Sequence, residues 1–507
     1  MRNQRITSFW KKCSLICGLV VMGLNAASQP LQAHQHVRLT LDSAVEIAMG
    51  SSYRIKQLGM GIERTRHWLK SRQASLKSHV SMSLKAPDIK ALSERKWNST
   101  LKKDQIIHEN TRRWQMDLSI RQPVVLFGYP TNGYLSINNQ VYRYLQRDGY
   151  DEVDYYNRYY LKFEQPFFLP NNLKNNIEEA ELDLERNELS YNTDRVRLLD
   201  QIADDYYDLY EVIYKDSIYI HQTINLEKIA IIADSVAQED TTRAIETAHV
   251  QVELANAREM LLKNNSDIRL ELMRIKQRLR LDHTDSVYLE PEIKITPVTV
   301  DVDQAVQYGF SLRPRLRMLA INKRKDEIDL NNSKGWDAFH MNLEVTYGLE
   351  KQDDRFGNIW QEYDNSNSVS LSAYIPIWDW GRRKERIQAN QISLRKTEMY
   401  IEESRNNIRS SITNAVRTLA EYQQRALNMQ ANLRMVQEIS DVGMKQYRDN
   451  AISLQDLLQS IDRQKETELN FLYAYMGYRR SLLSLMTQTY YDYENDISLE
   501  DKFRGKI

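Results

Sequence analysis

Apolar residues recur every seven positions along two long stretches of the chain. In the second stretch the row is unbroken and consists of Ile387, Leu394, Ile401, Ile408, Ala415, Tyr422, Met429 and Val436. The first stretch has a matching row at Leu182, Leu189, Val196, Ala203 and Tyr210. A seven-residue period held this long is typical of long helices that pack with a left-handed supercoil. We therefore predict helical hairpins over 171–282 and 384–487, and a first arm from about 171 to 236 would be roughly 100 Å long. On these rows alone, a plain coiled-coil rod explains the pattern equally well.

A second pattern, in which apolar and polar residues alternate, comes before each helical stretch. It predicts strands at about 78–86, 158–168, 340–350 and 367–377. In the first of these, Ser81 and Ser83 alternate with Met82 and Leu84, which gives the strand one polar and one apolar face. Four strands cannot close a barrel, and lipid does not tolerate open sheet edges. If these strands span a membrane, the chain must therefore oligomerise.

In each half, the alternating run directly before the long helix ends at a proline. These prolines are Pro166 and Pro376, and Gly381 follows in the second junction. Because proline lacks the backbone N–H that a strand ladder needs, we interpret these positions as strand–helix junctions.

The halves of the chain also resemble each other at an offset of 261 residues. The segment 39–48 aligns without a gap on 300–309, and Asp42, Ala44 and Val45 meet the same residue types. We predict two structural repeats, 34–299 and 300–487, and a C-terminal tail, 488–507. The first repeat has a long insertion, 87–157, whose run 114–123 also alternates and ends in proline. This insertion is either an extra extracellular hairpin or the place of the true second strand.

The first 33 residues have the pattern of a secretory signal peptide, with four basic residues ahead of a short apolar run. Both cysteines, Cys13 and Cys17, lie in it, so the mature chain has no thiol chemistry. Removing the four basic residues leaves 65 basic against 69 acidic residues. This mildly acidic balance argues against a nucleic-acid partner. We find no phosphate-binding loop, nucleophile elbow or metal-ligand motif, so we predict neither an enzyme nor a cofactor or metal site.

Three segments, in their order and spacing, resemble the TolC family of outer-membrane efflux channels. Segment 39–48 resembles the family's opening Leu-Thr-Leu-x-x-Ala-(Ile/Val)-x-x-Ala. Segment 375–383 is similar to its Pro-Leu-Phe-Asp-x-Gly-Arg-Arg junction. Segment 447–458 resembles its tip motif Tyr-x-x-Gly-x-(Ile/Val)-Ser-x-x-Asp-Leu-Leu, with Asn450 in place of the glycine. The tandem duplication is a fourth shared feature, and the resemblance covers nearly all of the mature chain.

The resemblance implies a mixed, mainly α fold that assembles as a homotrimer. Each chain would give four strands to one shared transmembrane β-barrel and its helical hairpins to a periplasmic α-barrel. The implied function is a passive exit duct of a tripartite efflux or type I secretion system. Its location is the outer membrane, extending into the periplasm, and its partners are a periplasmic adaptor and an inner-membrane transporter. The alternatives are a periplasmic adaptor protein or a structural periplasmic coiled coil.

The resemblance also implies roles for residues at the two hairpin tips. The channel entrance would carry Asp456, Gln459 and Glu246. The adaptor-docking tips would comprise Arg243, Ala244, Ile245, Asn450, Ala451, Ile452, Ser453 and Leu454. Two simpler interpretations stay open. Asp456 can be a solvated helix carboxylate paired with a neighbour such as Arg463, and Ile452 and Leu454 can hold the turn together from within.

Overall fold

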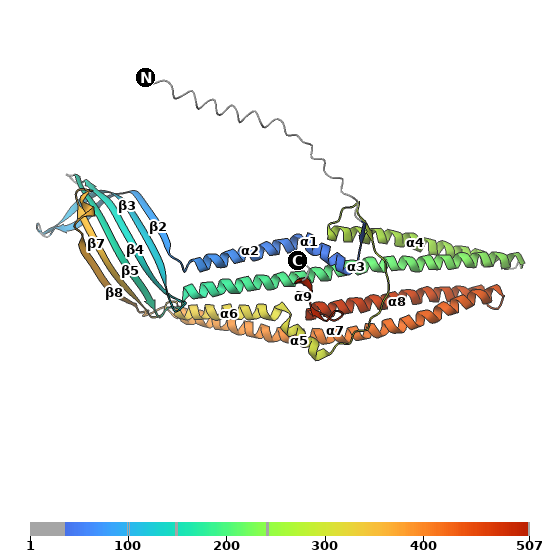
Figure 1. Ribbon diagram of the computed structural model, residues 1–507. Coiled ribbons are helices and arrows are strands. Elements are labelled where there is room, and N and C mark those ends of the chain that lie inside the picture. The colour runs from blue at the N-terminus through green and yellow to red at the C-terminus, as the bar shows by residue number, and fades with distance from the viewer. Residues whose placement is uncertain (1–35, 99, 101, 148–150, 240–242, 505–507) are drawn as a thin grey trace, which may run out of the picture.

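The computed structural model describes residues 36–98, 100, 102–147, 151–239 and 243–504, so the expected signal peptide lies outside the described residues. The chain is elongated, with an antiparallel sheet at one end and long helices running away from it (Figure 1). This mainly helical architecture agrees with the predicted fold class.

The helices follow the same order in both halves of the chain. In the first half they are α1 (Leu41–Ser51), α2 (Tyr53–Ala74), α3 (Asn172–Glu239) and α4 (Ala244–Leu279). In the second they are α5 (Val302–Ser311), α6 (Pro314–Gly335), α7 (Arg382–Arg448) and α8 (Leu454–Thr489), followed by α9 (Leu499–Arg504). Within the described residues, no helix combines the length and apolar character needed to cross a bilayer.

The long helices α3 and α7 change partners along their length. Beside the sheet, α2 packs on α3 and α6 packs on α7. Toward the far end, α4 packs on α3 and α8 on α7. In the predicted row of α7, Ile408 and Ala415 are buried and the other members are half-buried, so the row faces neighbouring helices as expected.

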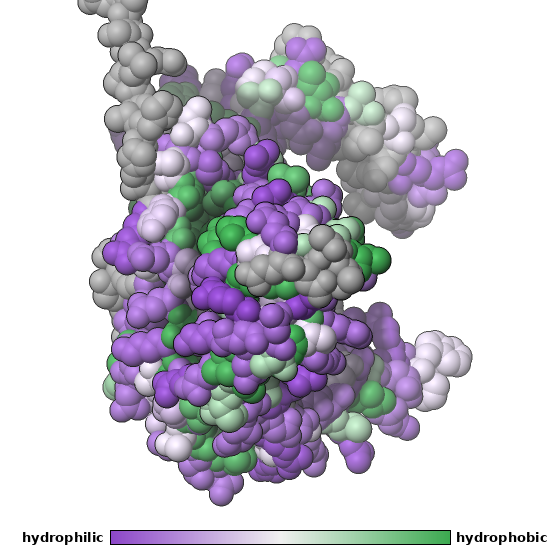
Figure 2. Space-filling view, turned by 90° about the vertical axis from the view of Figure 1, so that its right-hand side faces the viewer, coloured by the Kyte–Doolittle hydropathy of each residue, from purple (hydrophilic) through white to green (hydrophobic). Residues whose placement is uncertain are grey.

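Among the described residues, two hydrophobic cores hold these helices together. The larger core lies at mid-length, where α1, α5 and α9 pack around α3, α7 and α8. Short strands border this region: β1 (His36–Arg38) with β6 (Ser286–Tyr288), and β9 (Tyr491–Asp492) with β10 (Ile497–Ser498). The smaller core fills the far end, where the two hairpins finish. Seen from that end, hydrophilic residues cover most of the visible surface and apolar residues emerge in scattered patches (Figure 2).

The sheet has six strands in the order β2-β3-β4-β5-β7-β8. They are β2 (His79–Asn98), β3 (Lys103–Leu126), β4 (Tyr129–Arg147), β5 (Asp151–Phe167), β7 (His340–Asp353) and β8 (Asp364–Tyr374), with a 3-10 turn at Asn358–Trp360 between the last two. The expectation of four strands per chain is therefore wrong. The segment 87–157 extends β2 and adds β3 and β4, because its own alternating residues continue the ladder between β2 and β5. The proposed shift of the strand at 158–168 is also wrong, since β5 covers 158–167 and a short linker, 168–171, connects it to α3.

Candidate functional site: sheet faces, junctions and helix tips

All six strands of the sheet contribute to one apolar face. One cross-strand row runs over five neighbouring strands through Val80, Ile120, Ile137, Leu161 and Tyr347. Between 37% and 61% of the surface of each of these side chains is exposed in the chain. On β8 the same face continues at Val369 and Leu371. An exposed apolar surface of this extent across a sheet is typical of contact with another apolar phase.

The opposite face of the sheet is polar from edge to edge. One cross-strand row consists of Ser83, Asp117, Gln140, Arg158, Glu350 and Asp364. Several charges on this face form ion pairs within the sheet: Arg158 lies 3.5 Å from Glu350, and Lys162 lies 2.6 Å from Glu164 and 3.1 Å from Glu344. The sheet thus separates an apolar side from a hydrated side, as the wall of a pore does.

Exposed aromatic residues mark both ends of the apolar face. At the end beside the helices, the helix-side rim, they are Phe127, Tyr129, Phe168, Trp336, Phe339, Trp378 and Trp380. At the other end they are Trp97, Phe356 and Trp360. Aromatic rings that flank an apolar band are typical of the two water–lipid boundaries of a transmembrane sheet.

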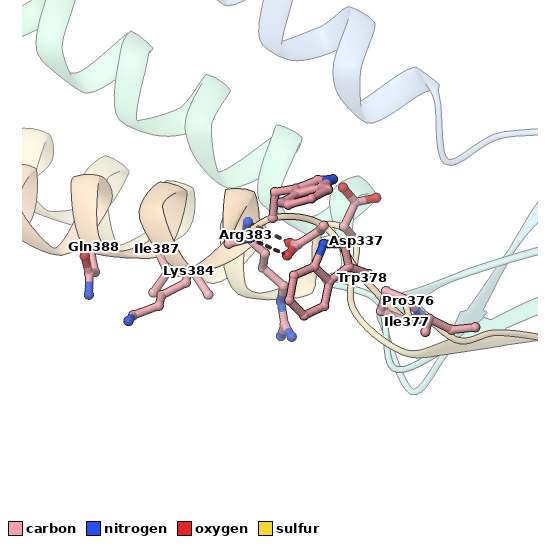
Figure 3. A pocket seen from close by; sticks show the side chains of 11 residues that line it. Asp337, Pro376, Ile377, Trp378, Arg383, Lys384, Ile387 and Gln388 are labelled. Atoms are coloured by element: carbon pink, nitrogen blue, oxygen red, sulfur yellow. Dashed lines mark hydrogen bonds between the residues drawn. The ribbon is translucent and has the colours of Figure 1, made fainter.

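The second strand–helix junction, 375–381, has a rigid turn (Figure 3). Gly381 begins α7 with φ of 82°, a backbone conformation that favours glycine. The Asp379 carboxylate accepts 2.9 Å hydrogen bonds from the backbone N–H groups of Arg383 and Gly381. These bonds hold the pKa of Asp379 below its usual range. Arg382 forms an ion pair with Asp337 at the end of α6 and so fixes α7 against its neighbour.

The same junction exposes two indole rings. Trp378 and Trp380 meet edge to face, with ring centroids 5.6 Å apart, and Trp380 is 88% exposed. Beside Trp378 is an open hollow that Asp337, Lys384 and Ile387 also line (Figure 3).

The predicted junction residues take different positions relative to their strands. Pro376 lies in the linker after β8, as expected. Pro166 does not end its strand, because β5 continues to Phe167 and Pro166 stands opposite Asn342 on β7. Asp379, which caps this turn, was not singled out from the sequence, although it belongs to the quoted motif.

At the far end, one polar cluster joins the two hairpin tips. The Tyr447 hydroxyl donates a 2.7 Å hydrogen bond to Glu246 Oε2. Arg243 donates to both carboxylate oxygens of Glu246, at 3.0 and 2.8 Å, and to Asn450 Oδ1 at 2.5 Å. We call these four residues the tip link. Tyr447 has no exposed surface, and burial together with the bond to Glu246 raises its pKa to about 12.

The other predicted tip residues divide into buried and exposed groups. Leu454 is buried in the tip core and Ile452 packs against that core, so both hold the turn from within. Ala244, Ile245, Ala451 and Gln459 are exposed. Asn450 has φ of 58°, which confirms that asparagine serves in place of glycine in this turn. Asp456 and Ser453 form a reciprocal capping box at the start of α8.

Comparison with known proteins gives the same architecture. No protein-family model matches the chain, and no curated protein sequence does. Solved structures do match, at low sequence identity. CusC, whose crystal structures concern transmembrane channel formation, has a TM-score of 0.65 at 11% identity, over 91% of this chain and 95% of its own.

The chain has the fold of an outer-membrane channel. The Campylobacter jejuni outer-membrane channel CmeC matches with a TM-score of 0.63 at 12% identity, over 94% of this chain and 93% of its own. The Vibrio cholerae outer-membrane protein VceC matches with the same score and identity, over 89% and 95% of the two chains. The resemblance to the TolC family is thus confirmed in the fold.

Proposed function

We propose that this chain is the outer-membrane exit duct of a tripartite efflux or type I secretion system. The observation that carries the proposal is the sheet with one apolar and one polar face, continued by helices that reach roughly 100 Å beyond it. The apolar face lies in the outer membrane, the helices cross the periplasm, and the polar face lines the duct. A periplasmic adaptor or a coiled-coil rod lies in water and would not need an exposed apolar sheet face.

The duct is a homotrimer closed by its sheet edges. In the described chain β2 and β8 are the edge strands of the six-stranded sheet. An open edge in lipid leaves unpaired N–H and C=O groups, which is strongly unfavourable. Pairing β8 of one copy with β2 of the next removes every edge, and three copies complete the ring.

Cysteine cross-linking tests this closure, because both native cysteines lie in the expected signal peptide. Ser81→Cys on β2 is combined in turn with Ser368→Cys, Ser370→Cys and Ser372→Cys on β8. We expect mild oxidation of membranes to give covalent dimers and trimers for at least one pair. Ser119→Cys on the interior strand β3 replaces Ser81→Cys in the control and should give none. A mature chain that is monomeric in detergent by light scattering, with no cross-links, would contradict the proposal.

The helix tips form the periplasmic entrance and dock the adaptor. Ile245 is 66% exposed and stands beside Ala244, so this turn offers a small apolar contact surface. Arg243, Asn450, Ala451 and Ser453 complete the docking surface, and Ile452 and Leu454 support it from within. Transport through the proposed duct is passive and draws its energy from an inner-membrane transporter.

At the entrance, Asp456 supplies a ring of three carboxylates that favours cations, with Gln459 and Glu246 nearby. Asp456→Asn tests this role selectively, since asparagine keeps an oxygen that can cap α8 but removes the charge. We expect lower cation selectivity in planar bilayers with unchanged thermal stability. Asp441→Asn, on the exposed side of α7, is the matched control.

A further inference from the structure

The β3–β4 hairpin has the same two faces as the rest of the sheet. Leu118 and Ile120 on β3, with Leu135 and Ile137 on β4, lie on the apolar face and pair across the strands with Val80, Met82, Leu161 and Phe163. Ser119 and Asn138 lie on the polar face and are joined by a 2.6 Å hydrogen bond. A hairpin outside the membrane would have water on both sides, and the separation of apolar and polar residues onto opposite faces would not be needed there.

The hairpin also extends to the helix-side rim. Its turn contains Phe127, which is 99% exposed, and Gly128, whose φ is 84°. Just beyond the turn, the Asn132 side chain donates a 2.7 Å hydrogen bond to the carbonyl oxygen of Pro170, and Asn171 donates to that of Pro130. These bonds hold β4 against the first residues before α3. The hairpin therefore ends at the level of the strand–helix junctions and spans the same height as its neighbours.

We infer that the β3–β4 hairpin is part of the transmembrane wall, so that the trimer proposed above builds a barrel of eighteen strands instead of twelve. Six strands from each of three chains give this number. At a strand spacing of about 4.8 Å and a tilt of about 40°, twelve strands give a backbone radius of roughly 12 Å and eighteen give roughly 18 Å. The inference rests on the proposed trimeric duct and concerns its outer end.

The side chains of the hairpin leave this wider bore open. On the polar face, the Arg121 guanidinium lies 3.7 Å from the ring centroid of Tyr134, and that of Arg113 lies 4.1 Å from Tyr142. Each arginine therefore stacks on a neighbouring strand and lies along the wall. The outer end of the duct thus admits cargo of larger cross-section, such as bulky solutes or polypeptide segments, than a twelve-stranded barrel does.

The test compares the full chain with a variant that lacks residues 99–150. This deletion joins the outer ends of β2 and β5, and it leaves four strands with the same alternation. Ser370→Cys, on the polar face of β8, is introduced into both chains. Cells are then treated from outside with maleimide-polyethylene glycols of increasing size. Access from this side does not depend on the state of the helix tips. We expect the full chain to react with larger polymers than the deletion variant does. By electron microscopy, the barrel of the full chain should be about 1.5 times as wide as that of the variant.

Two outcomes separate this inference from the proposed function. A trimer with the same polymer cut-off and the same barrel width for both chains would overturn the wider barrel and leave the duct intact. A full chain that forms no trimer in detergent would instead overturn the duct.

A second set of variants covers the case in which the deletion does not fold. Ser119→Cys and Asn138→Cys probe the polar face of the hairpin, and Leu118→Cys and Ile137→Cys probe its apolar face. We expect a small water-soluble maleimide to label only the first pair in whole cells. Equal labelling of all four would place the hairpin in water and overturn the inference.

Discussion

The hydroxyl of Tyr447 on α7 donates a 2.7 Å hydrogen bond to the carboxylate of Glu246 on α4, a residue 201 positions earlier in the chain. This bond ties the tip of the second helical hairpin to the tip of the first. Arg243 neutralises the same carboxylate and reaches Asn450, so the two tips share one polar cluster above one apolar core. Separating the tips therefore requires this cluster to break.

Tyr447→Phe should loosen the tips while keeping their packing. The substitution removes one hydrogen bond to a charged acceptor, worth about 1.5–3 kcal/mol, and leaves the ring in place. We expect faster backbone hydrogen exchange at the ends of α4 and α7, and a higher open probability in planar bilayers. Tyr400→Phe, at a 46% exposed position of the same helix, should change neither quantity. Equal effects of both substitutions would show that the bond does not restrain the tips.

Alkaline titration should detect the same hydroxyl. Its pKa is raised to about 12, mainly by burial and then by the bond to Glu246, whereas an unfolded tyrosine titrates near pH 10. The neutral phenol therefore stabilises the folded tips fully below pH 10, and this contribution is lost as the pH rises through 12. Subtracting the tyrosinate absorbance curve of Tyr447→Phe from that of the parent should leave one transition near pH 12. A difference transition near pH 10 would mean that Tyr447 is solvated.

Gly477→Ala should weaken the second hairpin. A methyl group at this position of α8 would lie 2.3 Å from ring atoms of Tyr422 on α7, so the two helices must move apart. We expect a loss of about 1–3 kcal/mol in thermal or denaturant unfolding. Gly59→Ala on α2 is the control, because its added methyl has nothing within 4 Å and alanine favours helix. Unchanged stability in Gly477→Ala would argue against the close approach of the helices.

Leu371→Arg should impair assembly far more than Ser370→Arg. The two positions are adjacent on β8 but lie on the apolar and polar faces respectively. An arginine on the lipid face of a transmembrane sheet costs about 2–4 kcal/mol near the bilayer midplane, whereas one on the lumen face stays hydrated. The amount of trimer in isolated outer membranes measures the difference. Similar yields for both variants would argue against lipid contact of the apolar face.

Asp379→Ala should release the start of α7. It removes the acceptor for two backbone N–H groups, those of Arg383 and Gly381. We expect faster hydrogen exchange of these two amides and an unchanged rate at the tips. Asp441→Ala, an exposed position of the same helix, is the control.

Because these bonds lower the pKa of Asp379, the cap should also survive acidification through the ordinary aspartate range and fail only at lower pH.

The features that the sequence predicted are those encoded by local periodicity. The row from Ile387 to Val436 predicted α7 and its buried side, and Asn450 predicted the left-handed turn. The number of strands was not predictable in this way. The alternation in 114–123 was visible, but alternation does not specify which strand is the neighbour, and so it did not place β3 between β2 and β4.

The tip link was missed for a related reason. Tyr447 begins a recognisable motif, yet its hydroxyl bonds to Glu246, which is 201 residues away in the chain. No periodic pattern connects two such positions. The role of Leu454 could not be predicted for the same reason. Its position beside a turn was equally consistent with adaptor docking and with internal support of the turn. The structure places it in the tip core, which favours internal support.

The two edge strands determine how a mutation in one of two gene copies should affect the assembled protein. In the proposed trimer, a copy with a damaged β8 edge still has a sound β2 edge, so it would join an unfinished ring and prevent its closure. When sound and damaged copies are made in equal amounts and mix freely, on the order of one ring in eight contains only sound copies. Damage at β8 should therefore be dominant over the sound gene, whereas a chain that never folds should be recessive.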